Sequence, residues 1–181
     1  MNRKGRVDLL SALIVVFFFA LGFLSAFLLV QPGDGERTPM SLTGAMIQQM
    51  PCMDTSGFVG TEISTDAANI YLRSGCYMLA ITTNELQTYS INSGINEIRG
   101  PRPTTHDVIQ DLMDMFEMEP LLVKIESLSQ GTYFAKMAVV QGTRVLDMDI
   151  RPSDAIAIAV RSGTPVWVNQ SLLEENGEFI C

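Results

Sequence analysis

Two short segments of the 181-residue chain bring together side chains that can bind an anion and move a proton. The first is RPTTHD, residues 102–107, and the second is RPSD, residues 151–154. In each, Arg and Pro precede a hydroxyl residue and an Asp at the start of a segment with helical character. Free backbone N–H groups at a helix start and a nearby Arg both donate to phosphate. We therefore expect Arg102 and Arg151 to hold a phosphate group.

His106 is the single histidine of the chain. Its side chain has an unperturbed pKa near neutrality, which makes it the candidate for proton transfer. A histidine in the first turn of a helix can equally be a capping or surface residue, and both interpretations stay open.

Three carboxylates form a candidate metal site, namely Asp107, Asp149 and Asp154. Asp149 lies near the end of a predicted strand that leads directly into the second helix. Carboxylate oxygens are the ligands that hard cations such as Mg²⁺ and Mn²⁺ prefer. We expect these three side chains to bind a divalent cation. The alternative for Asp107 is that it forms a solvated helix face with Asp111 and Asp114.

The same residues also suit a purely structural role. Pro is tolerated in the first turn of a helix, and Thr104 and Asp107 have the spacing of a capping box. A cation beside the positive end of a helix is unfavourable unless an anion lies between them. That anion is either a nearby Asp, as Asp154 is for Arg151, or a bound phosphate, and the two alternatives remain.

The elements that must position these residues follow from periodicity and turn residues. Apolar and β-branched runs predict strands at 58–63, 69–73, 76–83, 121–128, 132–140, 145–150 and 165–169. Helices are predicted at 85–98 after an Asn84 cap, from 102–103 to 116, from 152 to a Gly163 stop, and at 171–177. The three strands between 121 and 150 form an antiparallel meander. The order predicts an α+β fold, with a mixed or antiparallel sheet packed against helices.

Apolar positions predict which helix faces are buried. Leu86, Tyr89 and Ile91 should face inward from the first helix. On the second, an i, i+3, i+4, i+7 stripe is formed by Ile109, Leu112, Met113 and Phe116. The Ala- and Ile-rich helix after residue 152 has no polar face between 155 and 160, so it should be buried on nearly all sides.

The N-terminal part divides into a basic flank at 1–8, a transmembrane helix at 9–30 and a tether at 31–57, which leaves 58–181 as the folded domain. Residues 9–30 carry no charge and are long enough for a bilayer core of about 30 Å. A cleavable signal peptide is the alternative. Basic residues precede the span, so we expect a single-pass protein with a cytoplasmic N-terminus and an extracytoplasmic domain.

Charge and cysteines constrain the partners further. After residue 30 the chain holds 9 basic and 19 acidic residues, and 9 minus 19 is −10. Such a charge disfavours long-range capture of nucleic acid, so phosphate chemistry must be local. In an oxidising compartment Cys52 and Cys76 could pair and leave Cys181 over, whereas three unpaired thiols are the alternative.

From about residue 58 to 177 the chain resembles the bifunctional nuclease domain family, credited with DNase and RNase activity. RPTTHDVI at 102–109 is similar to the family's first motif, and DIRPSDAIAIAVRSGTPVWV at 149–168 is similar to its second. The resemblance implies that the site residues are His106, Asp107, Asp149, Arg151, Ser153 and Asp154. We expect catalytic roles for His106, Asp107 and Asp154, substrate binding by Arg102, Thr105, Arg151 and Ser153, and metal binding by Asp107, Asp149 and Asp154.

We therefore expect a membrane-anchored enzyme that hydrolyses DNA or RNA phosphodiesters with Mg²⁺ or Mn²⁺. Its partners would be nucleic acid or another phosphate-bearing ligand, the membrane, and a second copy if the domain is a homo-oligomer. The alternative is a non-catalytic module of the same fold that binds an anion or supports oligomerisation.

Overall fold

The computed structural model describes residues 45–46 and 49–181, all within the unit Pro39–Cys181. The predicted transmembrane helix at 9–30, the basic flank and most of the tether lie outside the described residues. Among the residues that are described, no helix is long and apolar enough to cross a membrane.

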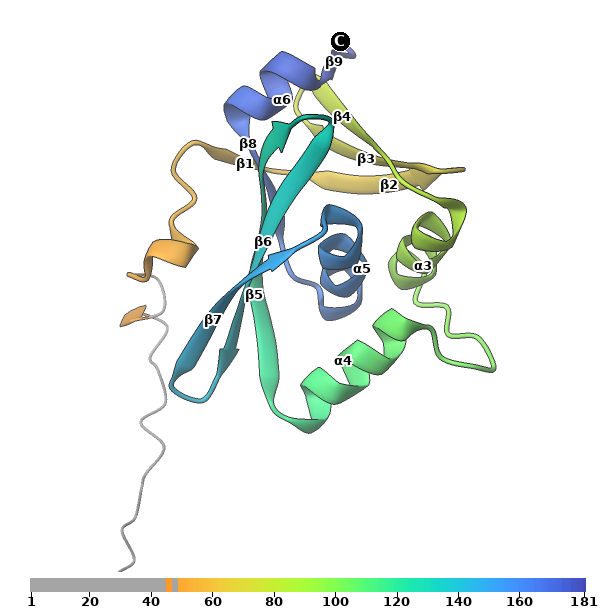
Figure 1. Ribbon diagram of the computed structural model, residues 1–181, viewed down its shortest axis with the longest axis vertical. Helices are drawn as coiled ribbons and strands as arrows, with labels where there is room; N and C mark the ends of the chain where they lie inside the picture. The colour runs from red at the N-terminus through yellow and green to blue at the C-terminus, as the bar shows by residue number, and fades with distance from the viewer. Residues whose placement is uncertain (1–44, 47–48) are drawn as a thin grey trace, which may run out of the picture. The chain divides into compact units, whose positions relative to one another are not determined.

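A five-stranded sheet forms one side of the domain (Figure 1). Its strands, in spatial order, are β1 (Phe58–Gly60), β8 (Val166–Asn169), β5 (Met118–Ser129), β6 (Thr132–Gln141) and β7 (Arg144–Ile150). Only the β5–β8 pair is parallel. The predicted meander is confirmed as β5, β6 and β7, and the α+β class is confirmed with it.

A four-stranded antiparallel sheet holds β2 (Glu62–Asp66), β3 (Asn69–Ser74), β4 (Tyr77–Thr82) and β9 (Glu178–Phe179) in that order. The prediction of one continuous strand at 58–63 is wrong. The chain leaves the first sheet and enters the second at Thr61, whose backbone N–H and hydroxyl both donate to the carbonyl of Val166, at 3.0 and 3.1 Å. A periodicity argument cannot detect this crossing because both halves alternate normally.

The helical elements are the 3-10 helix η1 (Pro51–Met53) and the helices α3 (Glu85–Ile95), α4 (Thr105–Met115), α5 (Pro152–Ser162) and α6 (Gln170–Asn176). α5 lies at the centre of the domain and packs against β5 and β6 as well as against α3 and α4 (Figure 1). Of the predicted buried residues 155–160, the first five are buried and Val160 is half-buried. Gly163 ends the helix in the left-handed region at φ 70°, also as predicted.

The predicted inner face of α3 is wrong in part. Ile91 is fully buried, but Leu86 is 81% and Tyr89 60% exposed. α3 instead approaches α5 through small residues, and Gly94 lies so close that an added Cβ would be 2.5 Å from a methyl carbon of Val160. Helix contact through small residues gives no apolar stripe, which explains why the pattern was misleading.

The predicted stripe on α4 is likewise only half buried. Met113 is in the core and Ile109 packs against it, whereas Leu112 and Phe116 are exposed to about half of their surface. Because α4 contacts the domain with one edge, two of the four apolar positions remain in contact with solvent.

The disulfide joins Cys76 to Cys181, and Cys52 is free. The predicted pairing of Cys52 with Cys76 is therefore wrong, as is the alternative of three thiols. The physical reason is β9, which pairs with β4 and so returns the chain end to the residue before β4. The two-residue strand β9 was too short to predict from sequence.

We expect removal of this disulfide to destabilise the domain by about 2 to 5 kcal/mol, since the bridge closes a loop with a sequence separation of 105 residues. Urea unfolding of Cys76→Ser and Cys181→Ser should show equal losses. Cys52→Ser is the matched control and should unfold like the unchanged protein. Peptide mapping that finds a bridge to Cys52 would contradict the structure.

Candidate functional site

His106 joins the two helix starts that the sequence singled out. Its imidazole Nε2 lies 3.3 Å from Asp154 Oδ1, at the start of α5, and its Nδ1 lies 2.9 Å from Ser90 Oγ on α3. Ser90 and His106 are both buried. Three helices, α3, α4 and α5, therefore meet at one imidazole.

Arg161 forms the centre of the same polar cluster. Its Nε donates to Asp107 Oδ1 at 2.7 Å, its Nη1 to the carbonyl of Ala157 at 2.7 Å and its Nη2 to Ser90 Oγ at 3.2 Å. The Arg161 and Asp107 side chains are only 7% and 10% exposed. This buried ion pair holds the first turn of α4 against the last turn of α5.

Asp107 also completes the predicted capping box, which the structure confirms. Its Oδ2 accepts from the backbone N–H of Thr104 at 2.6 Å and from the Thr104 hydroxyl at 2.8 Å. Burial by itself would raise the pKa of Asp107, but hydrogen bonds from Arg161 and Thr104 outweigh it and lower the pKa to about 2. Both carboxylate oxygens of Asp107 are occupied by internal donors.

Asp154 is the more open carboxylate of the cluster. Arg151 binds it with two hydrogen bonds, Nε to Oδ2 at 2.6 Å and Nη2 to Oδ1 at 3.1 Å. The Arg151 side chain is 73% exposed and that of Asp154 is 21% exposed. A ligand at the surface can therefore reach this pair without entering the core.

The pKa of His106 is lowered chiefly by burial. The neighbouring Asp154 opposes the shift, whereas the charge of Arg161 reinforces it. His106 is therefore neutral at pH 7. An unfolded histidine titrates near 6.5, so this residue makes the domain less stable as the pH falls below that value.

The structure does not bring every predicted residue into this cluster. Arg102 and Thr105 are exposed beside the start of α4, Asp149 is exposed on β7, and Ser153 is buried in the first turn of α5. In the part of the chain that the structure describes, none of these four side chains has a hydrogen-bond or ion-pair partner. In the register of β6 and β7, Asp149 lies opposite Lys136. Asp149 is therefore placed on the sheet and not at the helix starts.

The predicted metal ligands do not form a common site. Within residues 45–46 and 49–181, no three His, Cys, Asp or Glu side chains are arranged to hold a metal ion. Asp107 is occupied by Arg161 and Thr104, and Asp154 by Arg151. The donor set therefore does not fit a metal held by the protein alone.

Ser90 and Arg161 are members of the cluster that the sequence did not identify as site residues. The spacing in the sequence indicates Arg161, because it follows Asp154 by seven residues and so lies on the same face of α5. For Ser90 the sequence holds no such signal, since it is one of several polar residues on α3.

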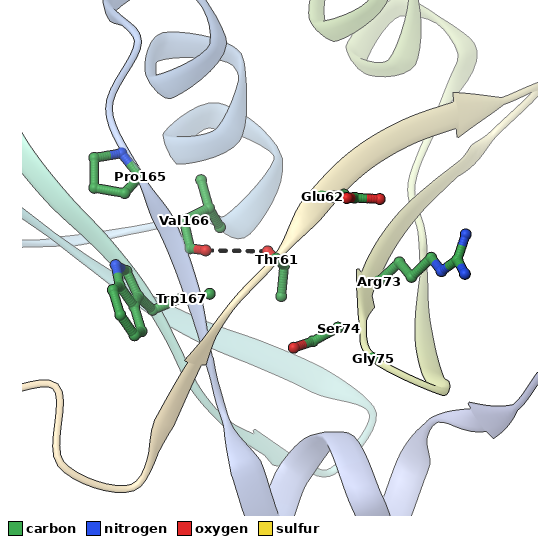
Figure 2. A pocket seen from close by; sticks show the side chains of 9 residues that line it. Thr61, Glu62, Arg73, Ser74, Gly75, Pro165, Val166 and Trp167 are labelled. Carbon is green, nitrogen blue, oxygen red and sulfur yellow. Dashed lines mark hydrogen bonds between the residues drawn. The ribbon is translucent and has the colours of Figure 1, made fainter.

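The surface of the domain also has cavities, of which one lies away from this cluster and another lies beside it. A cavity of about 550 Å³ lies where the chain crosses between the sheets, and Figure 2 shows its lining, including Thr61, Glu62, Arg73 and Trp167. None of the predicted site residues lines it. A second cavity of about 350 Å³ is bordered by Asp107 and Arg161 and thus adjoins the buried ion pair.

Together these features define an α+β domain with a polar cluster where three helices meet. Residues 72–180 match the model of the bifunctional nuclease domain, which covers more than half of the chain, and the chain belongs to this family. All predicted site residues lie within the matched region.

The chain is also similar to individual proteins, and the plant proteins among them carry the family name. The chain is 36% identical over 83 residues to an uncharacterized protein of Mycobacterium tuberculosis, covering 46% of this chain and 49% of that protein. It is 32% identical over 103 residues to bifunctional nuclease 2 of Oryza sativa subsp. japonica and 31% identical to bifunctional nuclease 2 of Arabidopsis thaliana. These matches cover 55% of this chain, but only 32% and 31% of the plant proteins. The chain thus spans about half of the first relative and about a third of the others.

We expect Asp107→Asn to destabilise the domain by about 3 to 5 kcal/mol at pH 7, because it leaves Arg161 buried without its counter-ion. The depressed pKa of Asp107 stabilises the fold above pH 4, and that contribution, about 2 kcal/mol, is lost as the pH falls from 4 towards 2. Urea unfolding across this pH range measures both effects.

The matched control is Asp111→Asn, one turn further along α4, where the ion pair with Arg99 is exposed. It should cost less than about 1 kcal/mol. Equal losses for the two variants would show that the Arg161–Asp107 pair does not hold the helices together.

Proposed function

We propose that this domain hydrolyses phosphodiester bonds in DNA or RNA at the shared start of α4 and α5. The observation that supports the proposal is the contact between His106 and Asp154 beside the exposed Arg151. Membership of the bifunctional nuclease domain family and the names of the plant relatives point the same way.

The roles follow from exposure. Arg151 and Arg102 are exposed cations at adjoining helix starts, suited to holding a phosphate with the free backbone N–H groups. Thr105, which is exposed in the first turn of α4, would contribute a further donor, whereas Ser153 is buried in the first turn of α5 and its proposed role in substrate binding rests on the family resemblance alone. Asp154 and His106 behind them handle the proton. Asp107 stabilises this arrangement through Arg161 and does not itself face the substrate.

The proposal includes a divalent cation, Mg²⁺ or Mn²⁺, that arrives with the substrate. Mg²⁺ is commonly held by one or two carboxylates together with phosphate oxygens rather than by a protein cage. Asp154 is the carboxylate of the cluster that is open to solvent, and Asp149 is a further exposed one. When bound, the cation would neutralise charge on the phosphate.

A non-catalytic module that binds an anion or supports a homo-oligomer is the second candidate. It is favoured by the internal pairing of the cluster, in which Arg151 already has Asp154 and Arg161 already has Asp107. Catalysis needs His106 and Asp154, whereas binding needs only the arginines and helix starts.

We expect Arg151→Ala and Arg102→Ala to weaken oligonucleotide binding by about 1.5 to 3 kcal/mol each, the value of a charge-assisted contact. His106→Ala and Asp154→Asn should retain binding and lower turnover of single-stranded DNA or RNA, measured with Mn²⁺ and with a chelator. Arg144→Ala, at an exposed position on β7, is the control and should change neither.

These two groups of variants separate the candidates. A non-catalytic module loses binding in the arginine variants but shows no cation-dependent cleavage in any form of the protein. If every variant instead changed only the melting temperature, the cluster would be structural and both candidates would be wrong.

We further propose that residues 9–30 anchor the protein in a membrane, with the domain on the extracytoplasmic side. The uncharged length of this segment and its basic flank support the anchor. The Cys76–Cys181 disulfide supports the compartment, because such bonds persist where the surroundings are oxidising.

Protease added to intact cells or spheroplasts should therefore digest the domain, since it would lie outside the cytoplasmic membrane. A cytoplasmic protein serves as the control for sealed membranes. Full protection of the domain, with digestion only after lysis, would contradict the proposed topology.

A further inference from the structure

The hydrogen bonds of Ser90 have a defined direction. A guanidinium has donors only, so Arg161 Nη2 must donate to Ser90 Oγ, at 3.2 Å. The single hydroxyl hydrogen of Ser90 is then free for His106 Nδ1, at 2.9 Å. Other hydroxyls on α3 donate to backbone carbonyls, as Ser93 does to Tyr89. Ser90 differs, since within the described chain its recorded partners are Arg161 and His106.

The contact at the other ring nitrogen of His106, Nε2, requires the same tautomer. His106 Nε2 faces Asp154 Oδ1 at 3.3 Å, and an ionised carboxylate can only accept a hydrogen bond. Nε2 must therefore carry the hydrogen, and Nδ1 must present its lone pair. Both neighbours of the ring favour the neutral tautomer protonated at Nε2, Ser90 through the shorter contact of 2.9 Å and Asp154 through the longer one of 3.3 Å.

We propose that Ser90, held by Arg161, is a positioning residue that fixes the tautomer of His106 and directs its Nε2–H at Asp154. This inference rests on the proposed function and refines it. The lone pair of His106 points inward to Ser90, so His106 orients the carboxylate. Asp154, the more open of the two, is the group that faces a substrate.

The array has the order of a serine–histidine–carboxylate set, but Ser90 is not placed to attack a substrate. It is 4% exposed, and its oxygen already accepts from Arg161. A nucleophile must reach the phosphorus atom, which a buried hydroxyl on the inner face of α3 cannot do. The role left for Ser90 is orientation of the ring.

Polar groups from three helices surround the His106 ring. Asp154 and Arg161 face it from α5, Asp107 lies on its own helix, and α3 contributes the uncharged Ser90. A hydrogen on Nδ1 would remove the acceptor for the Ser90 hydroxyl. Loss of Ser90 leaves the longer contact with Asp154 to select the tautomer, and should therefore weaken the tautomer preference.

The experiment uses the sole histidine of the chain as its own probe. The full-length protein, free of any histidine tag and labelled with ¹⁵N-histidine, gives one imidazole whose two nitrogens report the tautomer by NMR. The unchanged protein should show Nδ1 as the unprotonated nitrogen at pH 7. Ser90→Ala should show mixed tautomers, and Ser90→Thr should restore the original spectrum.

Ser93→Ala is the matched control, because Ser93 is a buried serine on the same helix whose hydroxyl donates to the carbonyl of Tyr89. Its imidazole spectrum should equal that of the unchanged protein. A hydrogen on Nδ1 in the unchanged protein would overturn the inference even if Ser90→Ala failed to fold. So would a folded Ser90→Ala protein with an unaltered imidazole spectrum.

Cleavage assays separate this inference from the proposed function. Ser90→Ala should lower kcat roughly ten- to hundredfold with little change in KM, the expected cost of a misplaced group. If the unchanged protein shows the Nε2–H tautomer but cleaves no nucleic acid, positioning by Ser90 is supported and the nuclease proposal fails. If it cleaves, and Ser90→Ala cleaves equally fast, the nuclease proposal is supported and the inference is wrong.

Discussion

The buried ion pair between Arg161 and Asp107 is the interaction on which the polar cluster depends. Two charges taken out of water cost several kcal/mol each unless their hydrogen-bonding groups are well satisfied. Here Arg161 also bonds Ala157 and Ser90, while Asp107 also bonds Thr104. The pair therefore fixes the relative positions of α3, α4 and α5, and with them the place of His106.

The central helix α5 has to meet two requirements. It must be narrow enough to lie between a sheet and two helices, which its alanine side chains permit. It must also carry Asp154 and Arg161 on one face. Close approach to α3 is possible because Gly94 has no side chain at the contact with Val160. The packing of the core and the geometry of the site thus depend on the same helix.

Interactions between residues close together in the chain made much of the fold predictable from the sequence. The capping box at Thr104 and Asp107, the Gly163 helix end and the meander all follow from residues close together in the chain, and all are confirmed. The errors concern contacts between distant segments: the sheet crossing at Thr61, the disulfide to Cys181 and the exposed Leu86. The motifs in the sequence identified His106 and Asp154 as candidate site residues. The Arg161–Asp107 pair joins residues 54 positions apart, so spacing along the chain does not predict it.

The charge of the chain and the internal pairing of the cluster together determine how a phosphate can bind. With −10 on the part after residue 30, no long-range attraction draws a polyanion to the surface. Arg161 is not available to bind a phosphate, because it is buried and paired with Asp107. Under the proposed function Arg151 would bind the phosphate, since its exposed guanidinium would need only to exchange Asp154 for a phosphate oxygen. That exchange would release the carboxylate of Asp154, while the contact with His106 would keep it oriented. Binding of the anion and exposure of a proton acceptor would then be one event, which links the two halves of the site without a preformed positive surface.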